Sequence, residues 1–141
     1  MEVRNLQEAI LAESAGACCV LVATHSPAGG RCIPFNGLIE EIKGHLSIPV
    51  MVRTHVGHTK EAEALVSIGC QFLDNSELLK VANEDYFLNK HELGIPCCCG
   101  CQNLGEALKR VGEGAAIIRI QGETSRSGDI SKTVKNMRSV S

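Results

Sequence analysis

Residues Ile48–His58 read IPVMVRTHVGH. The first five of them form an unbroken apolar run of strand length, and the stretch from Ala62 to Gly69 carries apolar residues at helical spacing. A continuous apolar strand followed by an amphipathic helix is typical of a βα unit in a parallel sheet that helices cover. This stretch therefore predicts an α/β fold.

The same alternation continues on both sides of this unit. The other predicted strands are Cys18–Ala23 (CCVLVA), Gln71–Asn75 (QFLDN), Ile95–Cys99 (IPCCC) and Ala115–Ile120 (AAIIRI). The other predicted helices are Leu6–Ala15, Leu38–Leu46, Leu104–Val111 and a last one marked by Ile130, Val134 and Met137. The intervals of roughly 20–30 residues match the size of a βα unit. Periodicity alone leaves a doubly wound sheet and a barrel open.

Local signals at the helix ends support these ranges. Asn5 and Asn103 each stand three residues before a glutamate, which is the capping-box spacing. Gly114 is the expected stop after the Leu104–Val111 helix. We interpret the apolar stripes of all these helices as core.

Composition is that of an ordinary soluble protein. Of the 141 residues, 44% are hydrophobic and 21% are charged, and the formal net charge is −2. The charges are interspersed, so no basic surface for nucleic acid or an anionic membrane is expected. Uncharged stretches are too short or too broken to span a bilayer, and no signal or transit peptide is expected. These features predict a cytoplasmic protein.

The eight cysteines invite a metal or redox interpretation. In the run CCCGC, adjacent strand residues point to opposite faces, so Cys97, Cys98 and Cys99 cannot all meet one ion. In a reducing compartment such thiols pack as small hydrophobic groups. We therefore predict core cysteines and no metal site.

Three segments carry a resemblance to a known family. They are Ile48–His58 (IPVMVRTHVGH), Asn89–Leu93 (NKHEL) and Cys99–Lys109 (CGCQNLGEALK), with support from LAESAGA at Leu11–Ala17, DNSE at Asp74–Glu77 and EGAAIIRIQG at Glu113–Gly122. In order and spacing they resemble the lyase subunit of pyridoxal 5′-phosphate (vitamin B6) synthase, the PdxS/SNZ family. The similarity covers almost the whole chain, apart from disturbances at Pro27–Gly37 and Thr124–Asp129.

The resemblance implies a (β/α)8 TIM barrel, of which the chain would carry about strands two to six of eight. Residues 1–141 would then form a single incomplete barrel domain. The family condenses a pentose phosphate, a triose phosphate and ammonia into pyridoxal 5′-phosphate, and a glutaminase partner supplies the ammonia. Because pyridoxal phosphate is the family's product, no bound cofactor is expected.

The family's chemistry runs through imines to two lysines, and neither lysine is present. By the match of motifs, Arg53 and Gln121 stand at those positions, directly after two strands. Imine formation needs a neutral amine, whereas a guanidinium stays protonated and an amide nitrogen is not nucleophilic. Arg53 could still hold a phosphate or a carboxylate. Most of the chain's seven lysines are expected on helix surfaces or ends, with Lys90 in a loop that leads into a strand.

Of the other positions in the family's site, some match in this sequence and others are altered. Asp74 and Arg119 match residues that line the family's pocket. Gly122 and Gly128 are remnants of its phosphate loop, in which Thr124–Ser127 replaces a glycine region that lets backbone N–H groups approach a phosphate. The acid of the first barrel strand is expected to be absent, because the chain would begin at the helix after that strand.

Two pairs of polar residues admit a plainer role. His55 and His58 could form a ligand pair, but the resemblance favours a structural role for His58 at the strand-to-helix turn. Asp74 and Glu77 could form an acid/base pair; we favour a pocket role for Asp74 and a helix-start role for Glu77, near the positive end of the helix dipole.

Three functions remain open. The favoured one is a non-catalytic relative that assembles with catalytic homologues, as the resemblance to such plant members implies; a glutaminase subunit is a weaker candidate for a partner. The second is a relic of a duplicated gene, which the altered Pro27–Gly37 segment and the missing strands suggest. The third is a working lyase of vitamin B6 synthesis, which would need imine chemistry that the sequence lacks.

Overall fold

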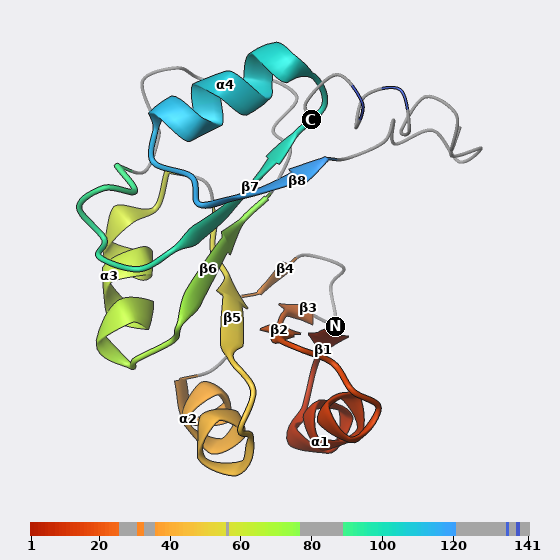
Figure 1. Cartoon of the computed structure of the whole chain (residues 1–141). Coiled ribbons are helices and arrows are strands. Elements are labelled where there is room, and N and C mark those ends of the chain that lie inside the picture. The colour runs from red at the N-terminus through yellow and green to blue at the C-terminus, as the bar shows by residue number, and fades with distance from the viewer. Residues whose placement is uncertain are drawn as a thin grey trace.

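A parallel sheet forms the centre of the molecule (Figure 1). The computed structural model describes residues 1–25, 31–32, 36–55, 57–76, 89–120, 135 and 138. Within them the sheet has six strands in the order β1-β2-β5-β6-β7-β8, and all neighbouring strands are parallel. The strands are Glu2–Val3 (β1), Val20–Val22 (β2), Val50–Arg53 (β5), Phe72–Asn75 (β6), Cys97–Cys101 (β7) and Ile117–Ile120 (β8). Thr24–His25 (β3) and Arg31–Cys32 (β4) form a separate antiparallel pair.

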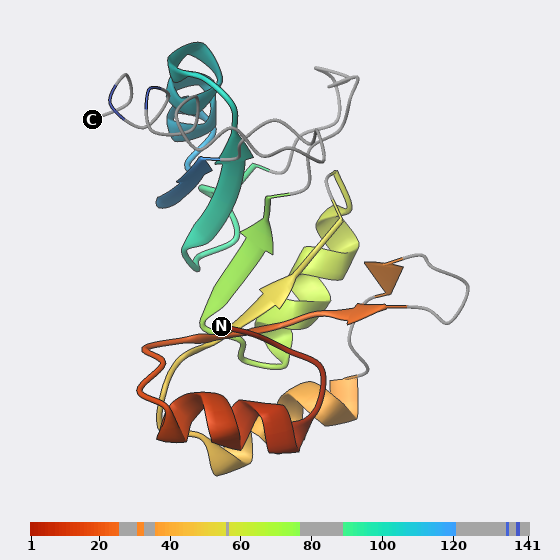
Figure 2. The ribbon, with the colours of Figure 1, turned by 90° about the vertical axis from the view of Figure 1, so that its right-hand side faces the viewer.

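The described helices lie along one side of the curved sheet. They are Leu6–Ser14 (α1), Asn36–His45 (α2), Thr59–Ser67 (α3) and Leu104–Gly112 (α4). Figure 1 shows them in an arc from α1 and α2 at the bottom, through α3, to α4 at the top, and Figure 2 shows the twist of the strands between them. This is the α/β architecture that the alternating pattern predicts.

Alternation along the strands divides the sheet into two faces. The outer face packs against the helices and includes Val20, Val22, Val50, Val52, Leu73 and Cys97. The inner face carries a smaller apolar cluster of Leu21, Met51 and Cys98, with Cys19 and Phe72 beside it. The predicted core role is confirmed for Cys97 through Cys99, which are buried free thiols, but not for Cys18, which is exposed.

The predicted helix caps are confirmed. The side chain of Asn5 accepts a hydrogen bond from the Glu8 amide at 2.9 Å, and that of Asn103 accepts one from the Glu106 amide at 3.0 Å. Gly114 follows α4 with φ 94°, a left-handed conformation that glycine adopts without strain. These contacts satisfy amide groups that the first turn of a helix leaves free.

The first strand corrects the sequence prediction. Glu2–Val3 pairs with β2 through Glu2↔Leu21 and Val3↔Val22, and Val3 is buried in the core. The chain therefore contains a strand ahead of the first predicted one, and this strand carries an acid, Glu2. Two residues are too few for periodicity to reveal a strand.

The apolar stripe of α4 is a second correction. Its large side chains Leu104, Leu108 and Val111 are exposed, and Ala107 is the stripe residue that is buried. The helix contacts β7 and β8, the last two strands of the described sheet. A helix beside an edge strand has fewer neighbours to cover its apolar face, which accounts for the exposure.

Several predicted features fall outside the described residues. They are the positions Gln121, Gly122 and Gly128, the Thr124–Ser127 replacement, Glu77, and the residues Ile130, Val134 and Met137 that mark the last predicted helix. Among the described helices, none has the length and hydropathy that a membrane span requires.

Candidate functional site

Four charged side chains gather on the inner face of the sheet. They are Glu2 on β1, Arg53 on β5, Asp74 on β6 and Arg119 on β8. Arg53 and Asp74 are register partners across neighbouring parallel strands, so their side chains leave the same face. In a parallel barrel the carboxyl ends of the strands, where Arg53 and Asp74 stand, form the end at which functional groups collect.

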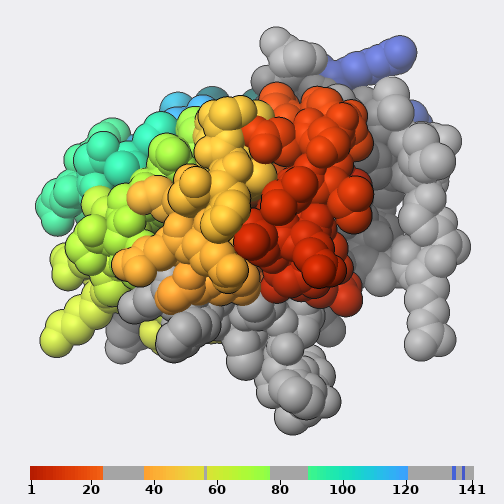
Figure 3. All heavy atoms as spheres, turned by 90° about the horizontal axis from the view of Figure 1, so that it is seen from below, coloured from red at the N-terminus to blue at the C-terminus, as the bar shows by residue number. Residues whose placement is uncertain are grey.

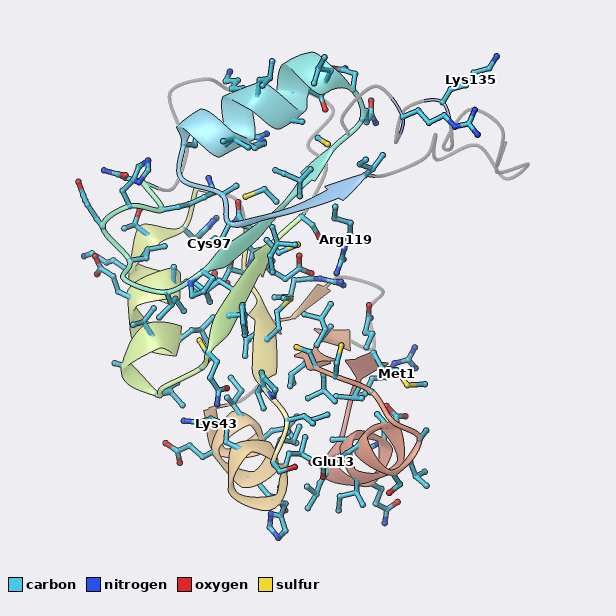
Figure 4. The ribbon with its side chains drawn as sticks, in the orientation of Figure 1. Met1, Glu13, Lys43, Cys97, Arg119 and Lys135 are labelled. Atoms are coloured by element: carbon cyan, nitrogen blue, oxygen red, sulfur yellow. The ribbon has the colours of Figure 1, made fainter. Side chains whose placement is uncertain are left out.

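Direct ion pairs connect these four groups. Arg53 donates from Nε to Asp74 Oδ2 and from Nη2 to Glu2 Oε2, both at 3.2 Å. Arg119 donates from Nη1 to Asp74 Oδ2 at 3.4 Å and to Ser76 Oγ at 3.2 Å. In Figure 4 Arg119 lies on the side of the sheet opposite α3. We call Glu2, Arg53, Asp74 and Arg119 the inner-face network.

Burial is uneven within the inner-face network. The Asp74 side chain is 0% exposed and the Arg53 side chain 15%, whereas Arg119 and Glu2 reach solvent at 40% and 41%. A buried carboxylate needs such partners, because its desolvation is otherwise costly. Asp74 is therefore the inner anchor of the network, and Glu2 and Arg119 are its solvent-facing ends.

Asp74 also affects a neighbouring thiol. Cys98 is its register partner on β7, and burial, reinforced by the Asp74 carboxylate, raises the pKa of Cys98 to about 11. The thiol is therefore protonated at neutral pH and is a poor nucleophile. Oδ1 of Asp74 is buried and has no hydrogen bond of good geometry within the described residues, although this thiol lies beside the carboxylate.

Hydrogen bonds hold the turn that follows Arg53. Asn75 donates from Nδ2 to Thr54 Oγ1 at 3.1 Å and to the His55 carbonyl at 3.3 Å. Glu61 accepts from the His55 amide at 3.0 Å and lies 3.2 Å from His55 Nδ1. The His58 ring stands 5.5 Å from that of His55. These contacts tie the turn between β5 and α3 to β6 and to the first turn of α3.

The described histidines, cysteines and acids do not assemble into a metal site. Within the described ranges, no group of three or more of these side chains could hold an ion. His55 is engaged with Glu61 instead, so the structural reading of this turn is favoured.

The buried lysine lies at the other end of the sheet. Lys90 stands in the loop before β7, and its Nζ is 3.1 Å from Glu113 Oε2. Arg110 Nη1 donates to the same oxygen at 3.0 Å. Burial raises the pKa of Glu113, but hydrogen bonds from Arg110 and Lys90 outweigh it and hold that pKa below its ordinary value. The predicted location of Lys90, before a strand rather than after one, is confirmed.

The structure therefore brings together part of the predicted site and adds to it. Arg53, Asp74 and Arg119 meet as the sequence predicts. Glu2 is an addition, and so is the support from Asn75 and Glu61. The sequence offers no periodic signal for Glu2, because its strand has only two residues.

Comparison with known proteins gives a consistent result. A family model described as the SOR/SNZ family matches residues 1–141. The chain is 49% identical over 142 residues to the pyridoxal 5′-phosphate synthase-like subunit PDX1.2 of Arabidopsis thaliana, which covers 99% of this chain and 45% of that protein. It is 44% identical over 146 residues to the synthase subunit PDX1.3 of the same plant, and this match covers 99% of this chain and 47% of that protein.

A bacterial relative shows the same extent of similarity. The chain is 42% identical over 146 residues to the pyridoxal 5′-phosphate synthase subunit PdxS of Clostridium acetobutylicum, which covers 99% of this chain and 50% of that protein. The chain thus spans about half the length of the curated relatives it matches.

Solved structures with little sequence identity share the fold. A mandelate oxidase variant matches with a TM-score of 0.70 at 17% identity, over 96% of this chain and 52% of that one. Dihydropteroate synthase of Xanthomonas albilineans matches with a TM-score of 0.62 at 13% identity, over 92% and 56%. Mandelate oxidase is a TIM-barrel protein, and the similarity supports the partial barrel that the sequence predicts.

Proposed function

This chain belongs to the SOR/SNZ family, and from that premise we propose that it is a non-catalytic partner of active pyridoxal 5′-phosphate synthase subunits. In this role it binds catalytic homologues and modulates their assembly or activity in the cytoplasm. It forms no imine with a sugar phosphate itself. Vitamin B6 synthesis remains the task of the partner subunits.

Arg53 is the observation that carries the proposal. Its guanidinium stands at the carboxyl end of β5, where the family resemblance expects an imine-forming lysine. The group cannot lose a proton at working pH, and its lone pair is delocalised. In the described structure the Arg53 guanidinium pairs with Glu2 and Asp74. Gln121, at the other lysine position, supports the same conclusion from the sequence.

Exposed apolar side chains support the partner role. Among the residues that the structure describes, the exposed large hydrophobic ones are Met1, Ile10, Leu11, Leu104, Leu108, Val111 and Ile117. All of them lie in or next to the two βα units at the edges of the sheet, β1 with α1 and α4 with β8. Figure 3 shows α1 at the molecular surface beside α2. Apolar groups beside open strand edges are typical of surfaces that other polypeptides cover.

Co-expression of the tagged chain with a catalytically competent homologue tests the proposal. Affinity purification followed by sizing of the eluate should give one large complex that contains both chains. A chain recovered alone, or only in aggregates, would contradict the partner role and favour a gene relic. Synthase activity of the chain by itself would contradict the non-catalytic part of the proposal.

A further inference from the structure

The inner-face network extends across the whole described sheet. Strand order places β2 between Glu2 and Arg53, and β7 between Asp74 and Arg119. The two arginines therefore reach over neighbouring strands to meet their partners. The network links the two edge strands, β1 and β8, through the interior strands β5 and β6.

The charges of the network cancel. Two guanidinium groups face two carboxylates, so the inner face offers little net attraction to a dissolved anion. Arg53 uses different nitrogens for its two acids, Nε for Asp74 and Nη2 for Glu2. A planar guanidinium can make such divergent bonds at once, whereas an ammonium is a compact point charge.

We infer that Glu2 and Asp74 are built-in counter-anions that keep free anions off Arg53 and Arg119. The arrangement is an autoinhibitory contact, in which carboxylates of the chain occupy the groups that would otherwise bind a phosphate. A phosphate would have to displace the bonds that the arginines make to Glu2 and Asp74. These carboxylates are attached to the same chain, so they compete with a dissolved phosphate at high effective concentration. It would also leave the buried Asp74 short of a partner.

Glu2 is the part of this contact that can be released without disturbing the core. Its side chain is 41% exposed, and Glu2→Gln keeps its size while it removes the charge. The variant leaves Asp74 paired with both arginines and gives the network a net positive charge. Arg53 Nη2 then lacks its anionic partner and can donate a hydrogen bond to an anion from solution.

Binding of inorganic phosphate tests the inference, with chloride at matched ionic strength as the reference. Titration followed by NMR of the arginine side chains should show no saturable binding to the wild-type chain at millimolar phosphate. Glu2→Gln should gain saturable binding, at least about tenfold tighter than any wild-type signal, because charge-assisted bonds to a guanidinium become available. The double variant Glu2→Gln/Arg53→Met should lose that gain.

Glu63→Gln is the matched control, because it makes the same chemical change on the exposed side of α3. It should behave as the wild-type chain does. Phosphate binding to the wild type as tight as to Glu2→Gln would overturn the inference, and so would a gain that persists without Arg53. The test concerns the isolated chain, so failure of the partner proposal would leave it intact.

Discussion

Arg53 has a structural role that its chemistry explains. At a position where the family resemblance expects an amine, the guanidinium joins a half-exposed acid on β1 to a buried acid on β6. The Arg53–Asp74 pair contributes more to stability than the Arg53–Glu2 pair, because a buried carboxylate that loses its partner keeps its desolvation cost. The pair with Glu2 is worth less, since solvent screens it.

Arg53→Lys should therefore destabilise the chain rather than merely restore a family residue. A lysine keeps the charge but loses the divergent geometry, so one of the two acids should lose its direct bond. We expect a loss of about 1–3 kcal/mol in the free energy of unfolding, measured by urea denaturation. Arg4→Lys is the control, because Arg4 is exposed and lies outside the network. Equal stability of Arg53→Lys and the wild type would show that the network contributes little.

Glu113 should give the chain a specific sensitivity to acid. Its pKa is lowered in the folded state by hydrogen bonds from Arg110 and Lys90, against the effect of burial. A lowered folded pKa stabilises the protein above the ordinary glutamate pKa of about 4.3, and that stability is lost as the pH falls through the folded value. Thermal unfolding between neutral pH and pH values below this range should show the loss.

Glu113→Gln identifies the source of that acid sensitivity. The variant should be less stable than the wild type at neutral pH, because Lys90 and Arg110 lose their anion. The difference in stability between Glu113→Gln and the wild type should narrow as the pH falls. A gap that stays constant with pH would assign the effect of the substitution to packing rather than to charge.

At the scale of elements, whether the sequence predicts a strand or helix correctly depends on the length of the element and on the neighbours that cover it. Strands such as β2 and β5 were predictable, because buried parallel strands are continuously apolar and both contain unbroken apolar runs of the sequence. β1 was not, since two residues carry no period and one of them is Glu2. The stripe of α4 was correctly placed on one face but wrongly assigned to the core, because a helical pattern does not reveal whether a neighbour covers it.

The same limit applies to the inner-face network. Motif positions indicated Arg53, Asp74 and Arg119, but the bonds between them depend on strands that are far apart in sequence and close in the sheet. Asp74 and Arg119 lie 45 positions apart and meet at 3.4 Å. Register and strand order bring them together, and neither can be read from local spacing.

The cap of α4 offers a test at the scale of an element. Asn103 accepts the Glu106 amide hydrogen bond, and Asn103→Ala would leave that amide without its partner. We expect a loss of about 1 kcal/mol in the free energy of unfolding, with faster amide exchange confined to the first turn of α4. Asn103→Asp should retain most of the stability, since a carboxylate accepts the same bond. Equal exchange in all three proteins would contradict the assigned cap.

At the scale of the whole molecule, most of the exposed large apolar side chains of the described residues fall into two groups, one near each end of the sheet. One group is Met1, Ile10 and Leu11, on or beside β1 and α1, and the other is Leu104, Leu108 and Val111 on α4, whereas Ile117 stands on the inner face of β8, the face of Arg119. The interior strands show no such exposure among the described residues, because helices cover their outer face. Within the described residues, this apolar exposure is concentrated in the elements at the two ends of the sheet.

Charged substitutions in these two groups test whether they carry assembly. Leu11 and Leu108 are 68% and 64% exposed, so Leu11→Glu and Leu108→Glu should leave folding cooperative and thermal stability nearly unchanged. Each should weaken co-purification with a catalytic homologue, because a carboxylate would be desolvated in the interface. Ala64→Glu, which adds the same charge on the exposed side of α3, should leave co-purification intact. If all three variants retain the partner equally, the edges of the sheet are not the assembly surface.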